Sequence, residues 1–280
     1  MSGKGPVDDS SEGPALEVRR TSGVIRSALA REMVTLGAFI GVVLAWWLAA
    51  FVIRSNLLLP APPAVAAKFW HLLVMRGQPY PLVTEMRASL QRILLGWGAG
   101  GVGGIAVGTL MSANRWVRHV VEPVVELFRP IPPLAFAPLL VIWFGIGEMP
   151  KVVIIVLTAF PVMVISTYAA TTNINPNWKL VALSLGAGRW HVLRHVIIPA
   201  ALPGILVGLR LASGLSWSTL VAAEIIASTS GLGWMILQAG VYLDTDTVFV
   251  GIVCIGGLAY FMDRGIRLVE ARLVPWRGRV

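Results

Sequence analysis

Two ionisable side chains, Arg210 and Glu224, lie inside an apolar stretch that runs from Pro199 to Ile226. Inserting an arginine in the middle of a membrane costs about 2.5 to 3.5 kcal/mol of free energy. Its presence therefore indicates a partner, a water-filled cavity or a function. The two residues are 14 positions apart. On a regular helix this spacing turns them about 40° from one another and separates them by about 21 Å along the axis. They therefore cannot pair within one helix.

These buried charges have two interpretations. In the first, they line a polar path together with nearby hydroxyl groups, with Glu224 towards the outer end of the helix and Arg210 in its inner half. In the second, each charge bridges to a neighbouring helix, and the two interpretations are compatible. The predicted pathway residues are Arg129, Arg210, Ser216, Ser218 and Glu224.

The sequence offers no arrangement that is typical of a catalytic centre. Its single cysteine, Cys254, excludes an intrachain disulfide and paired-cysteine metal motifs. No phosphate-binding G-x-x-x-x-G-K-[ST] loop occurs in the sequence. Four histidines lie in loops or at the ends of apolar runs, where solvated or interfacial residues are more common than metal ligands: His71, His119, His191 and His195. We expect this chain to be no enzyme and to hold no metal or cofactor.

The composition indicates a membrane protein. Only 13% of the 280 residues are charged, 56% are hydrophobic and the mean hydropathy is +0.76, whereas about a quarter of the residues of a soluble domain are charged. A net charge of +9 is compatible with nucleic acid, but basic loops beside an anionic leaflet explain it in a membrane protein. We therefore expect lipid, and no nucleic acid, around this chain.

Six apolar stretches approach or exceed the length of about 20 residues that crosses the hydrocarbon core. They run over residues 33–53, 93–114, 130–147, 152–178, 199–226 and 247–262. The sequence thus predicts an all-α integral membrane protein with about six transmembrane helices in one domain, residues 31–280. The preceding residues, 1–30, are rich in Ser, Gly and charge and are predicted to form a disordered cytoplasmic tail.

The distribution of Lys and Arg predicts the orientation. With the N-terminus in the cytoplasm, 15 of these residues fall in cytoplasmic segments and 5 in outer segments. The excess of basic residues on one side is typical of the cytoplasmic face. We expect both termini to be cytoplasmic in a bacterial inner membrane.

Glycine and proline mark two of the predicted spans. Gly96, Gly100, Gly104 and Gly108 follow one another at a spacing of four, which places them on one helix face where another backbone can approach closely. In the third span, Pro130, Pro132, Pro133 and Pro138 remove backbone donors within ten residues. Either the helix is broken at membrane depth, or the prolines form the first turn of a helix that begins late.

The segment 171–199 is amphipathic rather than membrane-spanning. Leu180 and Leu183, and then Trp190 and Leu193, recur at helical spacing, while glycines at 186 and 188 supply a turn between two short helices. Such a helix-turn-helix suits docking into the groove of a cytoplasmic partner. The alternative is a helix pair that lies on the membrane interface.

This segment resembles the EAA loop of permease subunits of ATP-binding-cassette importers. In that family a Glu-Ala-Ala triplet precedes a Gly and an Ile-x-Leu-Pro ending, and the loop docks onto the ATPase. Leu180 and Val181 stand in place of Glu-Ala, and the rest of the spacing is retained. From the pattern and the resemblance together, the predicted ATPase-coupling residues are Ala182, Gly186, Trp190, Leu193, Val196, Ile198 and Pro199.

Three further stretches resemble one branch of that family, the taurine, alkanesulfonate, nitrate and bicarbonate permeases. They run from Arg129 through Trp143 to Glu148, from Gly214 to Glu224, and from Gly231 to Gly233, and the ending Pro275-Trp276 looks most like taurine permeases. The resemblance implies a type I importer permease fold. It also implies an importer made of two permease copies, two cytoplasmic ATPase subunits that bind ATP and magnesium, and an extracytoplasmic solute-binding protein.

The function that the resemblance implies is translocation of a small anion, with taurine or another sulfonate expected first. The same class of transporter for nitrate, bicarbonate or a thiamine precursor is an alternative. A self-contained channel or secondary transporter is another, and it would need no docking loop and often has an inverted repeat. An integral-membrane enzyme would need a clustered acid, base or metal site at one membrane face, which the sequence does not contain.

Overall fold

The computed structural model describes residues 33–34, 37–74 and 81–275, and within these ranges the chain is helical with no strand. The chain divides into two compact units, residues 1–64 and 65–280, which are described separately. The predicted disordered tail, residues 1–30, and the residue Trp276 lie outside the described ranges.

The first unit contains an apolar helix, Gly37–Ile53. It covers most of the first predicted span, of which residues 35–36 are not described. The helix ends at a left-handed residue, Arg54, with φ of 52°. The indole Nε1 of Trp46 donates to the carbonyl oxygen of Pro60 at 3.1 Å, which ties the following segment back to the helix.

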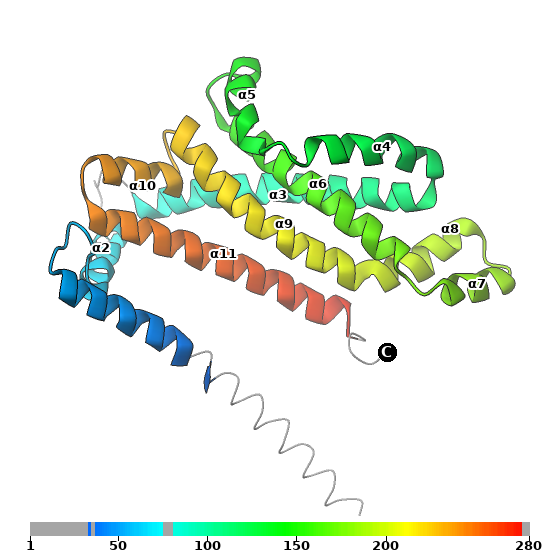
Figure 1. The fold of residues 1–280 in the computed structure, drawn as a ribbon, viewed down its shortest axis with the longest axis horizontal. Helices are drawn as coiled ribbons and strands as arrows, with labels where there is room; N and C mark the ends of the chain where they lie inside the picture. Colours follow the sequence, from blue (N-terminus) through cyan, green and yellow to red (C-terminus); the bar gives the residue numbers. More distant parts are fainter. Residues whose placement is uncertain (1–32, 35–36, 75–80, 276–280) are drawn as a thin grey trace, which may run out of the picture. The chain divides into compact units, whose positions relative to one another are not determined.

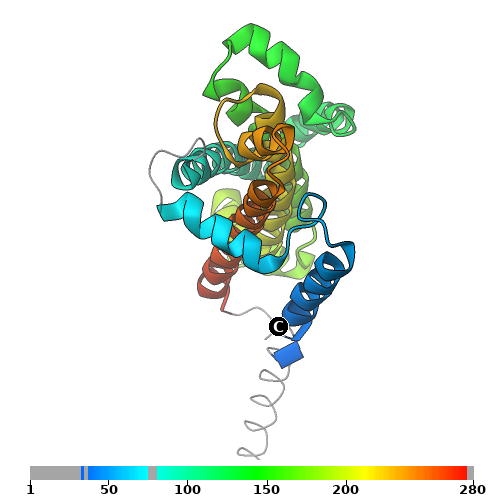
Figure 2. The same ribbon diagram turned by 90° about the vertical axis from the view of Figure 1, so that its left-hand side faces the viewer.

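The second unit is built around four long helices that lie side by side (Figure 1). In chain order the elements are α2 (Pro62–Val74), α3 (Leu82–Ala113), α4 (Arg115–Phe128), the 3-10 helix η1 (Pro133–Phe136), α5 (Ala137–Phe144), α6 (Glu148–Thr172), α7 (Pro176–Ser184), α8 (Arg189–Val192), the π-helix η2 (Leu193–Ile197), α9 (Ile198–Ala227), α10 (Leu232–Val241) and α11 (Thr245–Leu273). The long helices are α3, α6, α9 and α11. The short helix α10 lies at one end of this bundle, and α7 and α8 lie at the other (Figures 1 and 2).

Within the described residues, four helices are long and apolar enough to cross a membrane: Leu82–Ala113, Glu148–Thr172, Arg189–Ala227 and Thr245–Leu273. A fifth span is obtained if α4 and the pair η1–α5 are taken together, although their axes are bent by 86°. Two predicted boundaries are wrong by many residues, because α3 begins well before residue 93 and α11 continues well past residue 262. Counting uncharged runs ends a helix at its first charge, whereas these two helices continue past charges such as Arg92 and Asp263, which pair with residues of other helices.

The predicted glycine packing face on α3 is confirmed. A Cβ at Gly96 would lie 2.5 Å from Cβ of Ile155, and one at Gly100 would lie 2.8 Å from Cβ of Ala159. The glycines at 104 and 108 meet residues 163 and 167 of α6 in the same way. Because both series advance by four residues in the same direction, α3 and α6 run parallel and in register, with the backbones close enough that only hydrogen fits between them.

The proline-rich third span contains both predicted features. The chain turns between α4 and η1, so no single straight helix covers residues 115–144. Pro133 begins η1 and Pro138 stands in the first turn of α5, where a missing backbone donor costs nothing. The bend lies beside the cavity described below.

Candidate functional site

The three sequence stretches that carry the branch resemblance end at one place in the structure. Glu148 at the start of α6, Glu224 near the end of α9 and residues 231–233 at the start of α10 meet around Arg92 of α3. We call this group the α10 cluster. Its members are Glu85, Ser89, Arg92, Glu148, Lys151, Glu224, Ser230 and the backbone N–H groups of residues 231–233.

Arg92 lies at the centre of the α10 cluster, and every N–H of its guanidinium has an acceptor. Nε and Nη2 donate to the two carboxylate oxygens of Glu148 at 2.5 and 2.8 Å. Nη1 donates to Glu224 Oε1 at 2.6 Å and to the carbonyl oxygen of Ser230 at 2.8 Å, and Nη2 also donates to Ser230 Oγ at 2.8 Å. A buried guanidinium is stable only when its five donors are matched in this way.

The side chains of the α10 cluster also cap the start of α10. Glu224 Oε2 accepts the backbone N–H of Gly233 at 2.9 Å, and Ser89 Oγ accepts that of Leu232 at 2.9 Å. Glu85 accepts the N–H of Gly231. Carboxylates at a helix N-terminus satisfy its free donors and its dipole, so α3 and α9 hold α10 by its first turn.

Gly231 is required at the entry to α10. Its φ of 108° is one that L side chains rarely adopt, and a Cβ there would collide with the carboxylate of Glu224 and lie 2.5 Å from Nη1 of Arg92. The position therefore demands a residue without a side chain for both backbone and steric reasons.

The structure gives Glu224 partners on neighbouring helices, whereas its role in a pathway stays a prediction. Its side chain is completely buried in the α10 cluster, where it also accepts from Ser89 Oγ, and it lines neither of the two cavities described below. The bridging interpretation describes its geometry. The sequence analysis did not propose Arg92, because Arg92 was used only as the boundary of an uncharged run. Two signals for it were present in the sequence: a single Arg next to the glycine face of α3, and two glutamates at the ends of apolar stretches.

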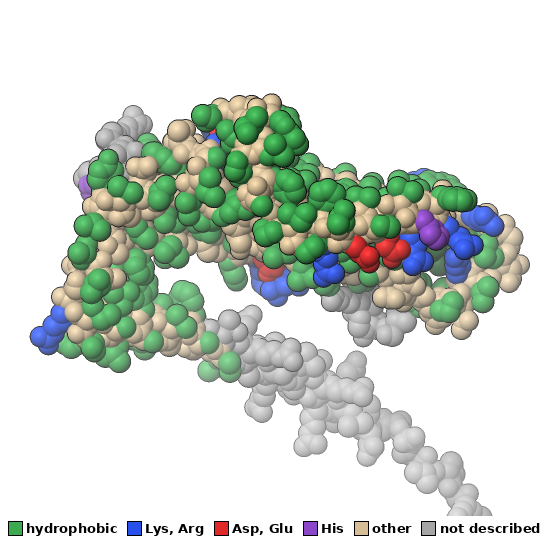
Figure 3. Space-filling model, turned by 45° about the horizontal axis from the view of Figure 1, so that its top comes forward, with side chains coloured by type: hydrophobic (Ala, Val, Ile, Leu, Met, Phe, Trp, Pro, Cys, Tyr) green, Lys and Arg blue, Asp and Glu red, His purple; other side chains and the backbone are tan. Residues whose placement is uncertain are grey.

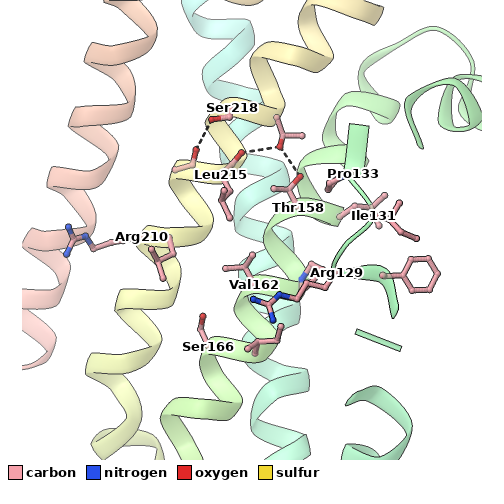
Figure 4. A pocket seen from close by; sticks show the side chains of 16 residues that line it. Arg129, Ile131, Pro133, Thr158, Val162, Ser166, Arg210, Leu215 and Ser218 are labelled. Atoms are coloured by element: carbon pink, nitrogen blue, oxygen red, sulfur yellow. Dashed lines mark hydrogen bonds between the residues drawn. The ribbon is translucent and has the colours of Figure 1, made fainter. Parts of the chain in front are cut away.

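The second candidate site is a cavity of about 800 Å³, which we call the α6–α9 cavity. Its walls come from the end of α4, the turn before η1, α6 and α9 (Figure 4). The lining residues are Phe128, Arg129, Ile131, Pro133, Leu157, Thr158, Pro161, Val162, Ile165, Ser166, Arg210, Leu211, Gly214, Leu215, Ser218 and Thr219. No carboxylate lies among them, so its charged lining is entirely cationic.

The two arginines of the α6–α9 cavity differ in their surroundings. Arg210 points towards α11, where its Nε donates to Asp263 Oδ1 at 2.8 Å (Figure 4). The guanidinium of Arg129 lies beside Val162 and Ser166 of α6 (Figure 4). Its side chain makes no ion pair or hydrogen bond with any residue that the structure describes. Arg129 is thus an unpaired cation facing the cavity.

Hydroxyl groups form the rest of the polar lining. Thr158 Oγ1 donates to Thr219 Oγ1 at 3.2 Å, which links α6 to α9 across the cavity wall. Ser218 lies on the lining as predicted, with its hydroxyl directed to the carbonyl oxygen of Gly214. Ser216 is different: it is fully buried, two residues round the helix from Ser218, and does not line the cavity.

The predicted docking segment forms a helix, a turn and a second helix. Asn175 caps α7 by accepting the N–H of Asn177 at 3.0 Å, with Pro176 in the first turn. The helix ends at Gly186, whose φ of 82° lets its N–H reach the carbonyl oxygen of Leu183, while the N–H of Ala187 reaches that of Ala182. This pair of bonds is a Schellman cap, which requires a left-handed residue at the glycine position.

The structure adds one detail about Gly186 and corrects one about the second helix. A Cβ at Gly186 would meet no atom within 4 Å, so the glycine is needed for its backbone angle and not for a close approach. The second helix is not a short separate element, because α8, η2 and α9 run without a break from Arg189 to Ala227. The helical periodicity of the loop and of the span is the same, and nothing in the sequence marks a boundary between them.

Some of the predicted coupling residues are exposed, and others are buried or partly buried. Trp190 is 71% exposed, and Leu185 in the turn is 82% exposed. Leu193 is buried, and residues 196, 198 and 199 are partly buried at the start of the long helix. Ala182 in α7 is also partly buried, whereas Gly186 in the turn is exposed. The exposed apolar surface is therefore concentrated at the tip, around the turn.

No group of three or more His, Cys, Asp or Glu side chains that could hold a metal ion occurs among the described residues. His119 and His195 each contact the carbonyl oxygen four residues earlier in their own helices. Cys254 is buried in α11 with a free thiol.

Comparison with known proteins agrees with this geometry. Residues 100–275, more than half of the chain, match the family described as binding-protein-dependent transport system inner membrane component. The taurine transport system permease protein TauC of Escherichia coli (strain K12) is 42% identical over 91% of this chain and 94% of its own length. SsuC of the same strain, which is named for the transport of aliphatic sulfonates, is 35% identical over 85% of this chain and 89% of its own length.

A solved structure shares the fold. A chain of the MetNI methionine ABC transporter, described in inward-facing conformations, superposes with a TM-score of 0.54 at 22% identity over 66% of this chain and 95% of its own. Together with the long sequence matches, this places the protein: it belongs to the family of inner-membrane permease components of binding-protein-dependent, ATP-binding-cassette transport systems.

Proposed function

We propose that this chain is the membrane subunit of an importer that carries taurine or another small sulfonate inwards. A solute-binding protein delivers the substrate, and a separate ATPase supplies the energy. The importer contains two copies of this chain and two ATPase subunits. The 42% identity to a taurine permease supports the substrate class.

The observation that carries the proposal is Arg129 in the α6–α9 cavity. Its guanidinium is unpaired, and the cavity lining has no carboxylate to repel an anion. A guanidinium binds oxyanions through parallel hydrogen bonds, and a sulfonate offers three oxygens. Arg129 therefore supplies the attraction for an anionic group, while the apolar remainder of the lining permits release.

Taurine also carries an ammonium group, which needs hydrogen-bond acceptors. The hydroxyl oxygens of Thr158, Ser166 and Ser218 in the lining are acceptors of this kind. They are few and uncharged, which suits passage rather than tight binding. Selectivity among sulfonates then lies largely with the solute-binding protein.

The proposed orientation has both termini in the cytoplasm, in a bacterial inner membrane, and rests on the basic residues of the loops. In that orientation the turn between α7 and α8 faces the ATPase. A cysteine in place of Gly188 should react only from the cytoplasm. Single cysteines at Ser10 and Gln78, which lie outside the described residues, should react from the cytoplasm and from outside, respectively.

The function is tested in proteoliposomes that contain this chain, its ATPase and its binding protein. We expect uptake of labelled taurine that requires ATP and all three components. Competition by ethanesulfonate, nitrate, bicarbonate and a thiamine precursor then ranks the substrate classes. Taurine uptake by this chain without the ATPase would instead indicate a channel or secondary transporter. ATP-driven uptake of nitrate alone would overturn the sulfonate assignment.

The coupling role of the α7–α8 turn is tested by two glycine substitutions. Gly186→Val places a β-branched residue at a φ of 82°, so the cap of α7 is lost and ATPase binding and uptake should fall at least tenfold. Gly188→Val is the control, because Gly188 has an extended backbone with a φ of −66° and no atom within 4 Å of a Cβ. Pull-down of the ATPase and ATP-driven uptake are measured on both. Equal ATPase binding by the two variants would remove this turn from the coupling surface.

A further inference from the structure

A second cavity, of about 630 Å³, lies between the docking segment and the end of α3; we call it the loop cavity. Three cations and an apolar wall share its lining. The lining residues are Ser112, Ala113, Arg115, Lys179, Leu183, Arg189, Trp190, Val192, Leu193 and Ile197.

The cations of the loop cavity are not neutralised by the chain. The side chains of Arg115, Lys179 and Arg189 make no ion pair or hydrogen bond with any described residue. No carboxylate contributes to the lining, and Glu122 of the adjoining helix α4 is engaged by Arg118 at 3.0 Å. Blue Lys and Arg side chains gather at this end of the second unit, whereas most of the remaining visible face is hydrophobic (Figure 3).

We infer the depth of the loop cavity in the membrane from the length of α3. Its floor, Ser112 and Ala113, is the end of α3, a helix of 32 residues. Such a helix is about 48 Å long, against about 30 Å for the hydrocarbon core and 40 to 45 Å with the headgroup regions. An end of α3 therefore stands among the headgroups, with Trp190 at the level where interfacial aromatic residues are common.

We propose that the loop cavity binds the phosphate headgroup of an anionic phospholipid from the cytoplasmic leaflet. The assignment to that leaflet rests on the proposed function and its orientation. Arg115, Lys179 and Arg189 bind the phosphate, and the apolar wall covers the first part of the acyl chains. The bound lipid bridges α4 to the docking segment and sets the position of the α7–α8 turn.

Charge and shape together favour a lipid over two other anions. A free phosphate would leave the apolar wall, including Leu183 and Ile197, exposed to water. An acidic surface of the ATPase would approach the exposed tip of the loop, whereas the three cations line a concavity behind it. Basic pockets at the cytoplasmic ends of membrane helices are suited to anionic headgroups.

The test uses the complete permease–ATPase complex in nanodiscs of phosphatidylcholine with added phosphatidylglycerol. Retention of phosphatidylglycerol is measured by native mass spectrometry for the wild type and for Arg115→Gln, Lys179→Gln and Arg189→Gln. Each substitution should weaken retention about fivefold, the factor that corresponds to about 1 kcal/mol per basic residue. The matched control is Arg194→Gln, an exposed arginine of η2 that does not line the loop cavity and should have no such effect.

Each outcome decides the proposal without reference to substrate uptake. Selective loss of phosphatidylglycerol in the three variants supports it. Equal retention by the variants and the control would overturn it. Displacement of the lipid by inorganic phosphate at millimolar concentration would show a site for a soluble anion instead. Loss of the ATPase with unchanged lipid retention would show that the three cations contact the ATPase.

Discussion

The α10 cluster and the α6–α9 cavity both contain arginine, but the two arginines differ in burial and in the number of hydrogen-bond partners. In the α10 cluster, Arg92 is buried and all five of its N–H groups have acceptors from other elements. In the cavity, Arg129 is exposed and has no partner among the described residues. A guanidinium that is fully matched by its own protein has no donor left for a ligand, so the first arginine holds the structure and the second is available to substrate.

Arg210 is intermediate between these two cases and sharpens the comparison. Its stem lines the cavity, while its head pairs with Asp263, and each side chain is about one third exposed. An ion pair of this exposure contributes little to stability because water screens it. Two arginines on the same cavity wall therefore differ in how many of their N–H groups are available to a ligand.

The largest expected effect is that of removing Arg92. Arg92→Met leaves the carboxylate of Glu224 buried without its cation, which costs about 3 to 5 kcal/mol. Arg87→Met, an exposed arginine of the same helix, should change stability by less than about 0.5 kcal/mol. The apparent free energy of unfolding is measured by titration with denaturing detergent in mixed micelles. Equal values for the two variants would contradict a structural role for Arg92.

Gly231→Ala should have the next largest effect. The added Cβ meets an unfavourable φ and the atoms of Arg92 and Glu224, for a combined cost of about 2 to 4 kcal/mol. Gly240→Ala, in the same helix α10 but with no atom within 4 Å of a Cβ, is the control and should be neutral or slightly stabilising. The same unfolding titration compares them. A harmless Gly231→Ala would mean that α10 is not held by its first turn.

Arg129→Gln should separate function from stability. Because the side chain is exposed and unpaired, unfolding should change by less than about 0.5 kcal/mol. Sulfonate uptake should fall about tenfold or more, since the cavity loses its free cation. Arg210→Gln, which breaks an exposed ion pair, should lower uptake less. If Arg210→Gln were the more damaging of the two, the role assigned to the unpaired arginine would be wrong.

The smallest effect is expected at Asp244, which caps α11 and pairs with Lys68 at 2.9 Å. Burial raises its pKa, but the hydrogen bonds from Lys68 and Thr247 outweigh this and hold the pKa below the usual value of 3.8. Its contribution is therefore present above that pH and is lost as the pH falls through the lower folded-state pKa. Asp244→Asn should cost up to about 1 kcal/mol at pH 7, because Asn can still cap the helix but lacks the charge that pairs with Lys68.

The pH dependence of that difference is the measurement. Unfolding of the wild type and of Asp244→Asn is compared from pH 7 down to pH 3. The two curves should converge below pH 3.8. A difference that stays constant across this range would assign the effect to something other than the carboxylate charge.

Local spacing in the sequence predicts much of this fold. Glycines at 96, 100, 104 and 108 predict a close helix interface, which the structure forms between α3 and α6, because residues spaced by four lie on one face of a helix. Gly186 likewise marks the end of α7, because a left-handed cap depends only on nearby residues.

The α10 cluster depends instead on residues far apart in the chain. Arg92 is 56 positions from Glu148 and 132 from Glu224, and no local pattern joins them. Residue types alone were also insufficient for the cavity. They indicated Arg129, Ser216 and Ser218 as candidates, but only the packing shows that Ser216 faces away from the cavity.

The unbroken helix from Arg189 to Ala227 has a mechanical consequence. Its 39 residues form a rod of about 58 Å that carries Trp190 at the loop, Arg210 at the cavity and Glu224 in the α10 cluster. A displacement of the helix near Trp190 would thus be transmitted through the backbone hydrogen bonds of one helix. The π-helix η2 lies between Trp190 and the rest of this helix, and its wider hydrogen-bond spacing permits a local change in the helical winding. Because Arg210 and Glu224 stand on the same helix, any rotation of that helix would move the arginine at the cavity and the glutamate under α10 together.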